Sequence, residues 1–287
     1  MEHRTTYGLV GYPLGHSLSP LMHNAAFEAL GVEARYELFP LRESELEGFF
    51  AAVKDAESPI FGFNVTVPYK EMVLKYMDHV SPLVEKIRAV NTVVVTPKRT
   101  LAAHNTDAPG FLAHLQELGF EPADRRIALL GAGGAARAIV GALGLLEKRP
   151  RRLTVYDVDT AKTEMLVSDL GGRIKMDRVE VVHSIDDLNI PDADLLINAT
   201  PIGLKPTDPV LVEADMMQPG MLVYDLIYNP RETKLLKMAK ARGAKTADGL
   251  GMLYYQGVLA FQHWADLQLD DSVKKLMREA LEKGKAI

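Results

Sequence analysis

The stretch that decides the fold is Ile127-Ala128-Leu129-Leu130-Gly131-Ala132-Gly133-Gly134-Ala135-Ala136. Four apolar residues lead into a glycine turn, and small residues that suit a helix follow it. A buried strand, a tight turn and a helix in this order open a doubly wound α/β sheet. Gly131 permits the turn, Gly133 lets a ligand approach the backbone, and Ala136 lets the helix pack closely on the strand.

This turn also predicts a binding site. The helix that follows it directs unpaired N–H groups and a partial positive charge at the turn, and both favour a phosphate. We therefore expect the backbone of Gly131, Ala132, Gly133, Gly134 and Ala135 to hold the pyrophosphate of a dinucleotide. The alternative is a glycine-rich turn that binds no ligand.

Short β-rich runs alternate with helical patterns on both sides of the turn, from residue 5 to about residue 248, which is the rhythm of a parallel sheet covered by helices. The expected strands are Tyr7 to Val10, Tyr36 to Phe39, Ile60 to Val67, Thr92 to Val95, Leu101 to His104, Arg126 to Leu130, Leu153 to Asp157, Val179 to Val182, Leu195 to Ala199, Leu222 to Leu226 and Lys245 to Ala247. We predict an α/β protein in which a Rossmann-type, doubly wound dinucleotide domain follows an N-terminal α/β substrate domain.

The domain junction is expected near Asp107 to Gly110. After Asp248-Gly249 the pattern changes to two helices, Leu250 to Asp266 and Asp270 to Lys283, with no further strand. We expect these helices to return to the first domain. The predicted substrate domain is therefore 1–108 completed by 250–287, and the dinucleotide domain is 109–249.

Composition excludes several classes of function. The 287 residues carry a net charge of −5 and no basic block, which argues against nucleic-acid binding. No apolar run approaches the roughly 18 residues of a membrane span. The absence of cysteine excludes thiolate metal sites and, with a start that lacks a secretory signal, favours the cytoplasm. We expect a small-molecule substrate and no metal; a homodimer is a candidate assembly.

Asp157 ends the strand after the glycine turn, where an acidic residue commonly binds the adenosine ribose. Its carboxylate would accept hydrogen bonds from ribose hydroxyls and repel a 2′-phosphate, and no arginine follows it. This favours NAD over NADP, although Lys162 leaves dual use open. The alternative is a strand-end or helix-capping aspartate.

Four segments of the first half place polar residues after apolar strands, where ligands of α/β sheets bind. They are Gly15-His16-Ser17-Leu18-Ser19-Pro20, Asn64-Val65-Thr66-Val67-Pro68-Tyr69-Lys70, Ala89-Val90-Asn91-Thr92 and Asn105-Thr106-Asp107. Ser17 and Ser19 precede a helix and suit a substrate carboxylate, but Ser19 also suits an N-cap. His16 and His23 lack a third ligand, so a metal role is improbable.

Lys70 is expected at the start of a helix, where the helix dipole disfavours a cation. An adjacent carboxylate would account for this lysine and could hold it ready for proton transfer. Asp107 is the candidate carboxylate, although its position before Pro109 also fits a helix cap.

Taken together, these segments resemble the shikimate dehydrogenase family over essentially the whole chain. Further matching motifs are Asn198-Ala199-Thr200-Pro201-Ile202-Gly203, Tyr228-Asn229-Pro230 and Gly251-Met252-Leu253-Tyr254-Tyr255-Gln256. The resemblance implies reversible hydride transfer between a nicotinamide cofactor and a ring alcohol, interconverting shikimate and 3-dehydroshikimate in aromatic amino-acid biosynthesis.

The resemblance also implies site residues. Lys70 and Asp107 would be the catalytic pair. The substrate would be bound by Ser17, Ser19, Thr66, Asn91, Tyr228 and Gln256, and the nicotinamide side by Thr200, Gly203 and Gly249. Tyr228 has a plain alternative as a packed aromatic at a strand end.

One departure concerns the cofactor. NADP-using members commonly carry Asn-Arg-Thr where this chain has Asp157-Val158-Asp159, which resembles instead the NAD-using quinate/shikimate dehydrogenase branch. Ser19 points the other way, since quinate-using members often have threonine there. The alternatives are such a quinate/shikimate enzyme of quinate catabolism, an aminoshikimate or folate-type oxidoreductase on the same scaffold, and a catalytically inactive dinucleotide sensor.

Overall fold

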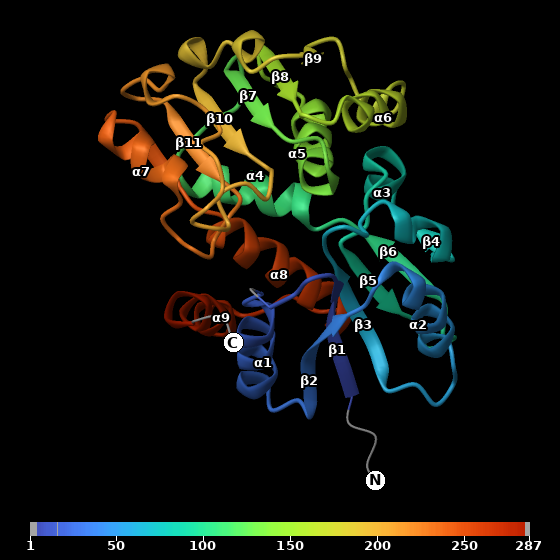
Figure 1. Cartoon of the computed structure of the whole chain (residues 1–287). Helices are drawn as coiled ribbons and strands as arrows, with labels where there is room; N and C mark the ends of the chain where they lie inside the picture. The colour runs from blue at the N-terminus through green and yellow to red at the C-terminus, as the bar shows by residue number, and fades with distance from the viewer. Residues whose placement is uncertain (1–4, 16, 285–287) are drawn as a thin grey trace. The chain divides into compact units, whose positions relative to one another are not determined.

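The computed structural model describes residues 5–15 and 17–284 (Figure 1). Contacts divide the chain into two compact units, Met1–Gly110 with Leu253–Ile287, and Phe111–Met252. Each unit is built on one six-stranded sheet. The α/β fold class expected from the sequence is confirmed.

The sheet of the first unit has the strand order β2-β1-β3-β5-β6-β4. Its strands are β1 (Thr5–Gly11), β2 (Ala34–Pro40), β3 (Ile60–Val65), β4 (His79–Val80), β5 (Thr92–Val95) and β6 (Leu101–His104). β1 runs parallel to β2 and β3, whereas β5 is antiparallel to both β3 and β6. The expectation of a parallel sheet from residue 5 onward is therefore wrong for this unit. Residues 96–100, which join β5 and β6, are too few for the crossover that a parallel pair needs.

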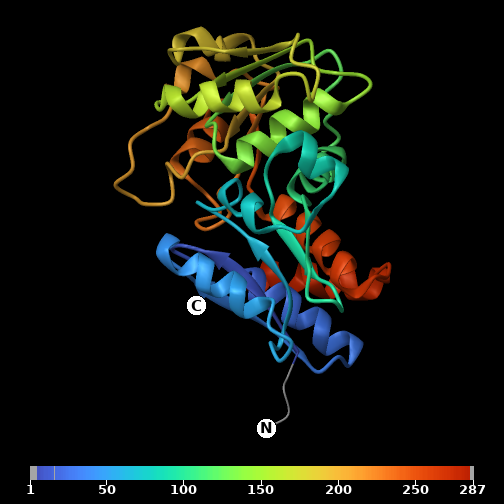
Figure 2. The ribbon, with the colours of Figure 1, turned by 90° about the vertical axis from the view of Figure 1, so that its right-hand side faces the viewer.

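The helices of the first unit are α1 (Ser19–Leu30), α2 (Leu46–Val53), α3 (Pro82–Ile87), α8 (Leu250–Ala265) and α9 (Asp271–Lys283). Leu46, Phe50 and Val53 of α2 form one core with Phe63 and Val65 of β3. The C-terminal helices lie beside α1, with α9 packed on it, as two perpendicular views show (Figure 1, Figure 2).

Trp264 explains how α8 is attached to the sheet. Its indole N–H donates to the carbonyl of Val93 at 3.0 Å. Its ring lies where a Cβ at Gly62 would stand, only 2.5 Å from that position. A side chain at position 62 would therefore displace the helix that closes this unit.

The second unit has the strand order β12-β11-β10-β7-β8-β9, and all its pairs are parallel. Its strands are β7 (Arg126–Leu130), β8 (Arg152–Tyr156), β9 (Val179–Val181), β10 (Leu195–Asn198), β11 (Leu222–Asp225) and β12 (Lys245–Ala247), with helices α5 (Gly134–Leu145), α6 (Thr160–Leu170) and α7 (Lys234–Ala241). This is the doubly wound order, with its topological switch between β7 and β10. α4 (Asp107–Glu117) spans the residue at which the chain divides.

Successive side chains of β7 point to opposite faces of the sheet, and each face has its own apolar core. Ile127 and Leu129 belong to one apolar cluster, and Ala128 and Leu130 to another. The strand is therefore covered on both faces, as its uninterrupted apolar sequence predicts. Within the described residues, no helix is long and apolar enough to cross a bilayer.

Candidate functional site

A buried ion pair stands at the centre of the first unit's polar residues. Lys70 Nζ lies 2.6 Å from Asp107 Oδ2, and the two side chains are only 11% and 6% exposed. Asp107 is the first residue of α4, and Lys70 lies in the turn after β3. The expected pairing of these residues is present.

The expectation that Lys70 lies at the start of a helix is wrong. The residue does not begin an α-helix; it precedes a short 3₁₀ helix, Met72–Tyr76, by two positions. A helix dipole therefore does not act on it in the way the sequence suggested. Its ammonium group is held by the carboxylate of Asp107.

The side-chain amide of Asn91 links the second oxygen of Asp107 to Thr106 and Gln256. Asn91 Nδ2 donates to Asp107 Oδ1 at 2.9 Å, to Thr106 Oγ1 at 2.9 Å and to Gln256 Oε1 at 3.3 Å. Asn91 lies just before β5, and Gln256 on α8. The structure thus brings Asn91, Asp107 and Gln256 together with Lys70, from segments as far apart as residues 70 and 256.

A second row of polar residues lies behind this group. Tyr36 of β2, Asn64 of β3 and Thr92 of β5 are buried and hydrogen-bonded to one another and to Asn91. Asn64 and Thr92 lie inside motifs that the sequence singled out, but their role as a buried network carries no sequence signal. Tyr36 was missed because nothing in its strand marks a hydrogen-bonded tyrosine.

Ser17, Ser19 and Thr66 belong to the same unit. Ser17 Oγ accepts from the backbone N–H of Ser19 at 3.3 Å, and Ser19 is buried. The N-cap of α1 is Leu18 and no side chain caps the helix, so the capping alternative for Ser19 is wrong. Thr66 follows β3 directly and is half-buried.

The two histidines differ. His16 lies outside the described residues. His23 is fully buried, stacked on Tyr36 with 4.4 Å between ring centroids, and neither ring nitrogen has a hydrogen-bond partner. Burial lowers the pKa of His23 to about 3. Among the described residues no group of three or more His, Asp or Glu side chains is arranged to hold a metal ion.

The glycine turn of the second unit has the geometry that its sequence predicts. Gly131 has φ of +106°, and a Cβ there would stand 3.0 Å from the backbone of Ala199. Gly133 is the N-cap of α5, and a Cβ built on it meets no atom within 4 Å. The turn thus leaves open space beside backbone N–H groups at a helix start, which fits a pyrophosphate.

Asp157 is bonded to the backbone of two neighbouring loops. Its Oδ2 accepts from the backbone N–H of Ala132 at 2.8 Å, and its Oδ1 from that of Asp159 at 2.9 Å. Asp159 in turn caps α6 by accepting from Ala161. The carboxylate of Asp157 therefore fastens the glycine turn to the end of β8.

The loop after β10 is held by buried polar side chains. Asn198 Oδ1 accepts from the backbone N–H and the hydroxyl of Thr200, at 3.0 and 2.7 Å. Asn198 Nδ2 donates to the carbonyl of Ile202 at 3.1 Å and to Asp225 Oδ1 at 2.9 Å. Gly203, with φ of +115°, donates its N–H to Asp208. Thr200 and Gly203 thus sit on one anchored loop.

The carboxylate of Asp225 holds Asn198 and, through it, the loop after β10. Its Oδ2 accepts from the Thr233 hydroxyl at 2.6 Å, and its Oδ1 accepts also from the N–H of Ile227 at 3.1 Å. Burial raises the pKa of the Asp225 carboxyl to about 6, although its hydrogen bonds act in the opposite direction. Nothing in the sequence marks Asp225 beyond its place at a strand end.

Two further expected residues lie beyond β11. Tyr228 is half-buried just before the cis peptide bond Asn229–Pro230. At Gly249 a Cβ would stand 1.9 Å from the carbonyl oxygen of Leu226. Close packing alone therefore explains glycine at position 249.

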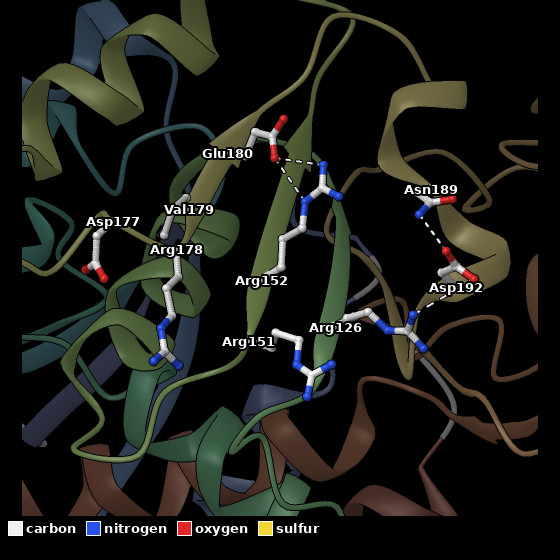
Figure 3. A pocket seen from close by; sticks show the side chains of 9 residues that line it. All are labelled: Arg126, Arg151, Arg152, Asp177, Arg178, Val179, Glu180, Asn189 and Asp192. Atoms are coloured by element: carbon white, nitrogen blue, oxygen red, sulfur yellow. Dashed lines mark hydrogen bonds and ion pairs between the residues drawn. The ribbon is translucent and has the colours of Figure 1, made fainter.

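A hollow of about 430 Å³ lies on the second unit at a place other than the glycine turn (Figure 3). Arg126 and Arg152, which begin β7 and β8, line it, so it lies at the amino ends of the strands. The glycine turn is at the carboxyl ends, where ligands of such sheets bind. Figure 3 shows Arg152 directed at Glu180, with an N–O distance of 2.7 Å. The hollow is built from exposed ion pairs and is separate from the dinucleotide loops.

The buried lysine–carboxylate pair on one α/β unit and the glycine turn on a doubly wound sheet define a dinucleotide-dependent oxidoreductase. Residues 9–93 match the family model described as the shikimate dehydrogenase substrate binding domain. A shikimate dehydrogenase (NADP(+)) from Moorella thermoacetica is 39% identical over 287 residues, covering 95% of this chain and 92% of that protein. The chain belongs to the shikimate dehydrogenase family.

Solved structures of this family have a similar fold. Shikimate dehydrogenase from Aquifex aeolicus has a TM-score of 0.85 at 35% identity, covering 96% of this chain and 98% of that one. Shikimate 5-dehydrogenase from Thermus thermophilus, in complex with NADP(H) and shikimate, has a TM-score of 0.81 at 36% identity, covering 97% and 98%. A quinate dehydrogenase from Corynebacterium glutamicum in complex with NAD has a TM-score of 0.84 at 32% identity, covering 97% and 99%.

The expectation that NAD is the more probable cofactor is wrong. The Moorella relative is named for NADP(+), and the Thermus structure holds NADP(H). The physical reason lies in Asp157, whose two oxygens accept backbone N–H groups of the glycine turn and its own loop. An acidic residue that makes these backbone bonds does not show whether the adenosine ribose of the cofactor carries a 2′-phosphate.

Proposed function

We propose that this protein is a shikimate dehydrogenase that reversibly reduces 3-dehydroshikimate to shikimate with NADP(H), in the shikimate pathway. The observation that carries the proposal is the Lys70–Asp107 pair, buried and bonded to Asn91, in a chain of this family. A dinucleotide sensor would have no need of such a pair.

The chemistry of ketone reduction matches this pair. A nicotinamide cofactor held at the glycine turn would supply the hydride, and the substrate's carbonyl oxygen would then carry developing negative charge. The Lys70 ammonium stabilises that charge and passes a proton from Nζ to the oxygen. Asp107 holds the ammonium in place through its Oδ2. In the oxidation, Lys70 takes the proton from the alcohol as hydride leaves the carbon.

The remaining residues bind and orient the ligands. Ser17 and Ser19 fit the carboxylate of the substrate, and Thr66, Asn91 and Gln256 offer donors and acceptors to its ring hydroxyls, with Tyr228 as a further contact. We assign the pyrophosphate to Gly131 through Ala135, and the nicotinamide side to Thr200 and Gly203, with Gly249 beside them. Asp157 acts on the cofactor through the glycine turn that it fastens.

The proposed function also includes the division of the chain into two domains, its location in the cell and its assembly. Residues 1–108 with 250–287 would form the substrate domain, and residues 109–249 the dinucleotide domain. The enzyme would act on small molecules in the cytoplasm, and light scattering would show whether it is a homodimer.

Initial rates with shikimate and quinate, each with NADP and NAD, test the proposal. We expect shikimate with NADP to give the highest kcat/KM. A higher kcat/KM for quinate with NAD would identify the quinate/shikimate enzyme. No turnover with any combination of substrate and cofactor would favour the alternative of a catalytically inactive dinucleotide sensor.

A second experiment tests the catalytic pair. Lys70→Ala removes the proton donor, so kcat should fall by about 100-fold or more while KM for shikimate changes little. Lys75→Ala, at an exposed lysine of the 3₁₀ helix that follows, is the matched control and should keep wild-type kcat. Near-normal kcat in Lys70→Ala would refute the role of Lys70.

A further inference from the structure

We propose that Thr92 and Tyr36 are positioning residues, which hold the amide of Asn91 in the one orientation that serves Asp107. This inference rests on the proposed function, since it concerns the same reaction. Thr92 is bonded to Asn91, and Tyr36 to Asn64, so both would act through Asn91.

The Asn91 amide has two orientations that differ by exchange of oxygen and nitrogen, and only one directs its N–H₂ group at Asp107. In that orientation Nδ2 donates to Asp107 Oδ1 at 2.9 Å. Oδ1 then accepts from the backbone N–H of Thr106 at 2.7 Å and from Thr92 Oγ1 at 3.1 Å. Exchange of the two groups would set two N–H₂ hydrogens against the N–H of Thr106 and leave Asp107 facing an oxygen.

Thr92 has one hydroxyl proton, and Asn91 Oδ1 lies 3.1 Å from its oxygen as an acceptor. The same oxygen accepts from Asn64 Nδ2 at 3.1 Å and lies 3.0 Å from Thr106 Oγ1. Because Thr106 Oγ1 accepts from Asn91 Nδ2 at 2.9 Å, we assign the Thr92 proton to Asn91 Oδ1. Thr92 is fully buried, so no solvent can replace a lost partner. An unmet partner in such a site costs more than the bond itself contributes.

Tyr36 fixes the far end of the chain of bonds. Its hydroxyl donates to Asn64 Oδ1 at 2.8 Å, which turns Asn64 Nδ2 toward Thr92 and toward the carbonyl of Asn91, 3.0 Å away. The ring of Tyr36 is itself held by the stacked ring of His23. A single direction of donation therefore runs from Tyr36 through Asn64, Thr92 and Asn91 to Asp107.

The test compares two buried strand threonines. Thr92→Val keeps the shape and removes the hydroxyl, and we expect kcat for shikimate to fall about 10- to 100-fold, since small displacements of catalytic groups carry such penalties. Thr92→Ser restores a hydroxyl and should return kcat to within about threefold of wild type. Thr154→Val is the matched control: Thr154 is also buried, on β8, and its hydroxyl donates only to the carbonyls of Ile127 and Leu188. It should lose stability and keep wild-type kcat.

Tyr36→Phe is the milder variant, which keeps the inference testable if Thr92→Val does not fold. Its kcat should fall about 3- to 10-fold, with a smaller change in KM. A fall in kcat no larger in Thr92→Val and Tyr36→Phe than in Thr154→Val would overturn the inference.

Hydrogen exchange of the Asn91 side-chain amide, followed by NMR, separates this inference from the proposed function. Its protons should be protected in wild type and Thr154→Val, and exchange faster in Thr92→Val and Tyr36→Phe. If wild type does not turn over shikimate but this pattern is found, the proposed function fails and the positioning network stands. Unchanged exchange in both variants would overturn the network whatever the activity.

Discussion

Replacement of Asp225 by asparagine should stabilise the second unit at alkaline pH and not at acid pH. Burial raises the pKa of this carboxyl from its ordinary value of 3.8 to about 6. A carboxyl with a raised pKa stabilises the folded state fully below its unfolded pKa, and that stability is lost as the pH rises through the folded pKa. At pH 8 the buried carboxylate is therefore ionised at a net cost to the fold.

The size of this cost follows from the shift. At roughly 1.4 kcal/mol for each pKa unit, a rise from 3.8 to about 6 corresponds to about 3 kcal/mol at pH 8. Asparagine can keep all three partners: its oxygen accepts from Asn198 and Ile227, and its N–H₂ group donates to a rotated Thr233 hydroxyl. We thus expect Asp225→Asn to gain up to about 3 kcal/mol at pH 8 and about zero near pH 4.

Calorimetric unfolding of wild type and Asp225→Asn at pH 4 and pH 8 measures this difference. For a unit of this size a gain of about 3 kcal/mol raises Tm by about 6–12 °C. A carbon-13 NMR titration of the Asp225 carboxyl gives its pKa directly. Equal destabilisation at both pH values would refute the reasoning, because it would mean that ionisation of Asp225 carries no net cost in the folded state.

Three further substitutions test other features of the structure. Gly131→Ala should destabilise the second unit by about 1–3 kcal/mol, because φ is +106° and the new Cβ meets Ala199, and a Tm equal to that of wild type would contradict this. Thr233→Val should cost about 1–3 kcal/mol, and more at pH 8 than at pH 4, since the ionised Asp225 loses a donor; urea unfolding at the two pH values checks the difference. The free energy of unfolding of His23→Phe should rise relative to wild type as the pH falls below about 6.5, because a histidine with a lowered pKa is protonated first in the unfolded chain. Urea unfolding that gives the same difference between the two proteins at pH 7 and at pH 4.5 would disprove this.

Much of the fold follows from local sequence. The strands Thr92–Val95, Leu101–His104, Arg126–Leu130 and Lys245–Ala247 begin and end where predicted, because apolar runs bounded by turn residues mark buried strands well. The direction of β5 could not be read in the same way. The direction follows from the length of the connection at 96–100, which is too short for the crossover of a parallel pair, and an apolar run by itself carries no direction. The two-residue strand β4 is too short to leave any pattern.

The candidate site was predictable only where a motif marks it. Lys70 and Asp107 lie in recognisable motifs, and the structure brings them together. The hydrogen bonds of Asp157 to the N–H groups of Ala132 and Asp159 involve backbone atoms that no sequence pattern records. Tyr36 meets Asn64 across 28 positions of chain, and such contacts emerge only from the packed sheet.

The return of the C-terminal helices to the first unit has a consequence for biosynthesis. The second unit is one continuous stretch, 111–252, so a ribosome releases everything it needs before the chain is finished. The first unit begins earlier but waits for residues 253–287, which bring Trp264 to the sheet and Gln256 to Asn91. During synthesis the part that starts first is therefore completed last, and a prematurely ended chain would keep an intact glycine turn while Asn91 and Asp107 lack the helix that covers them.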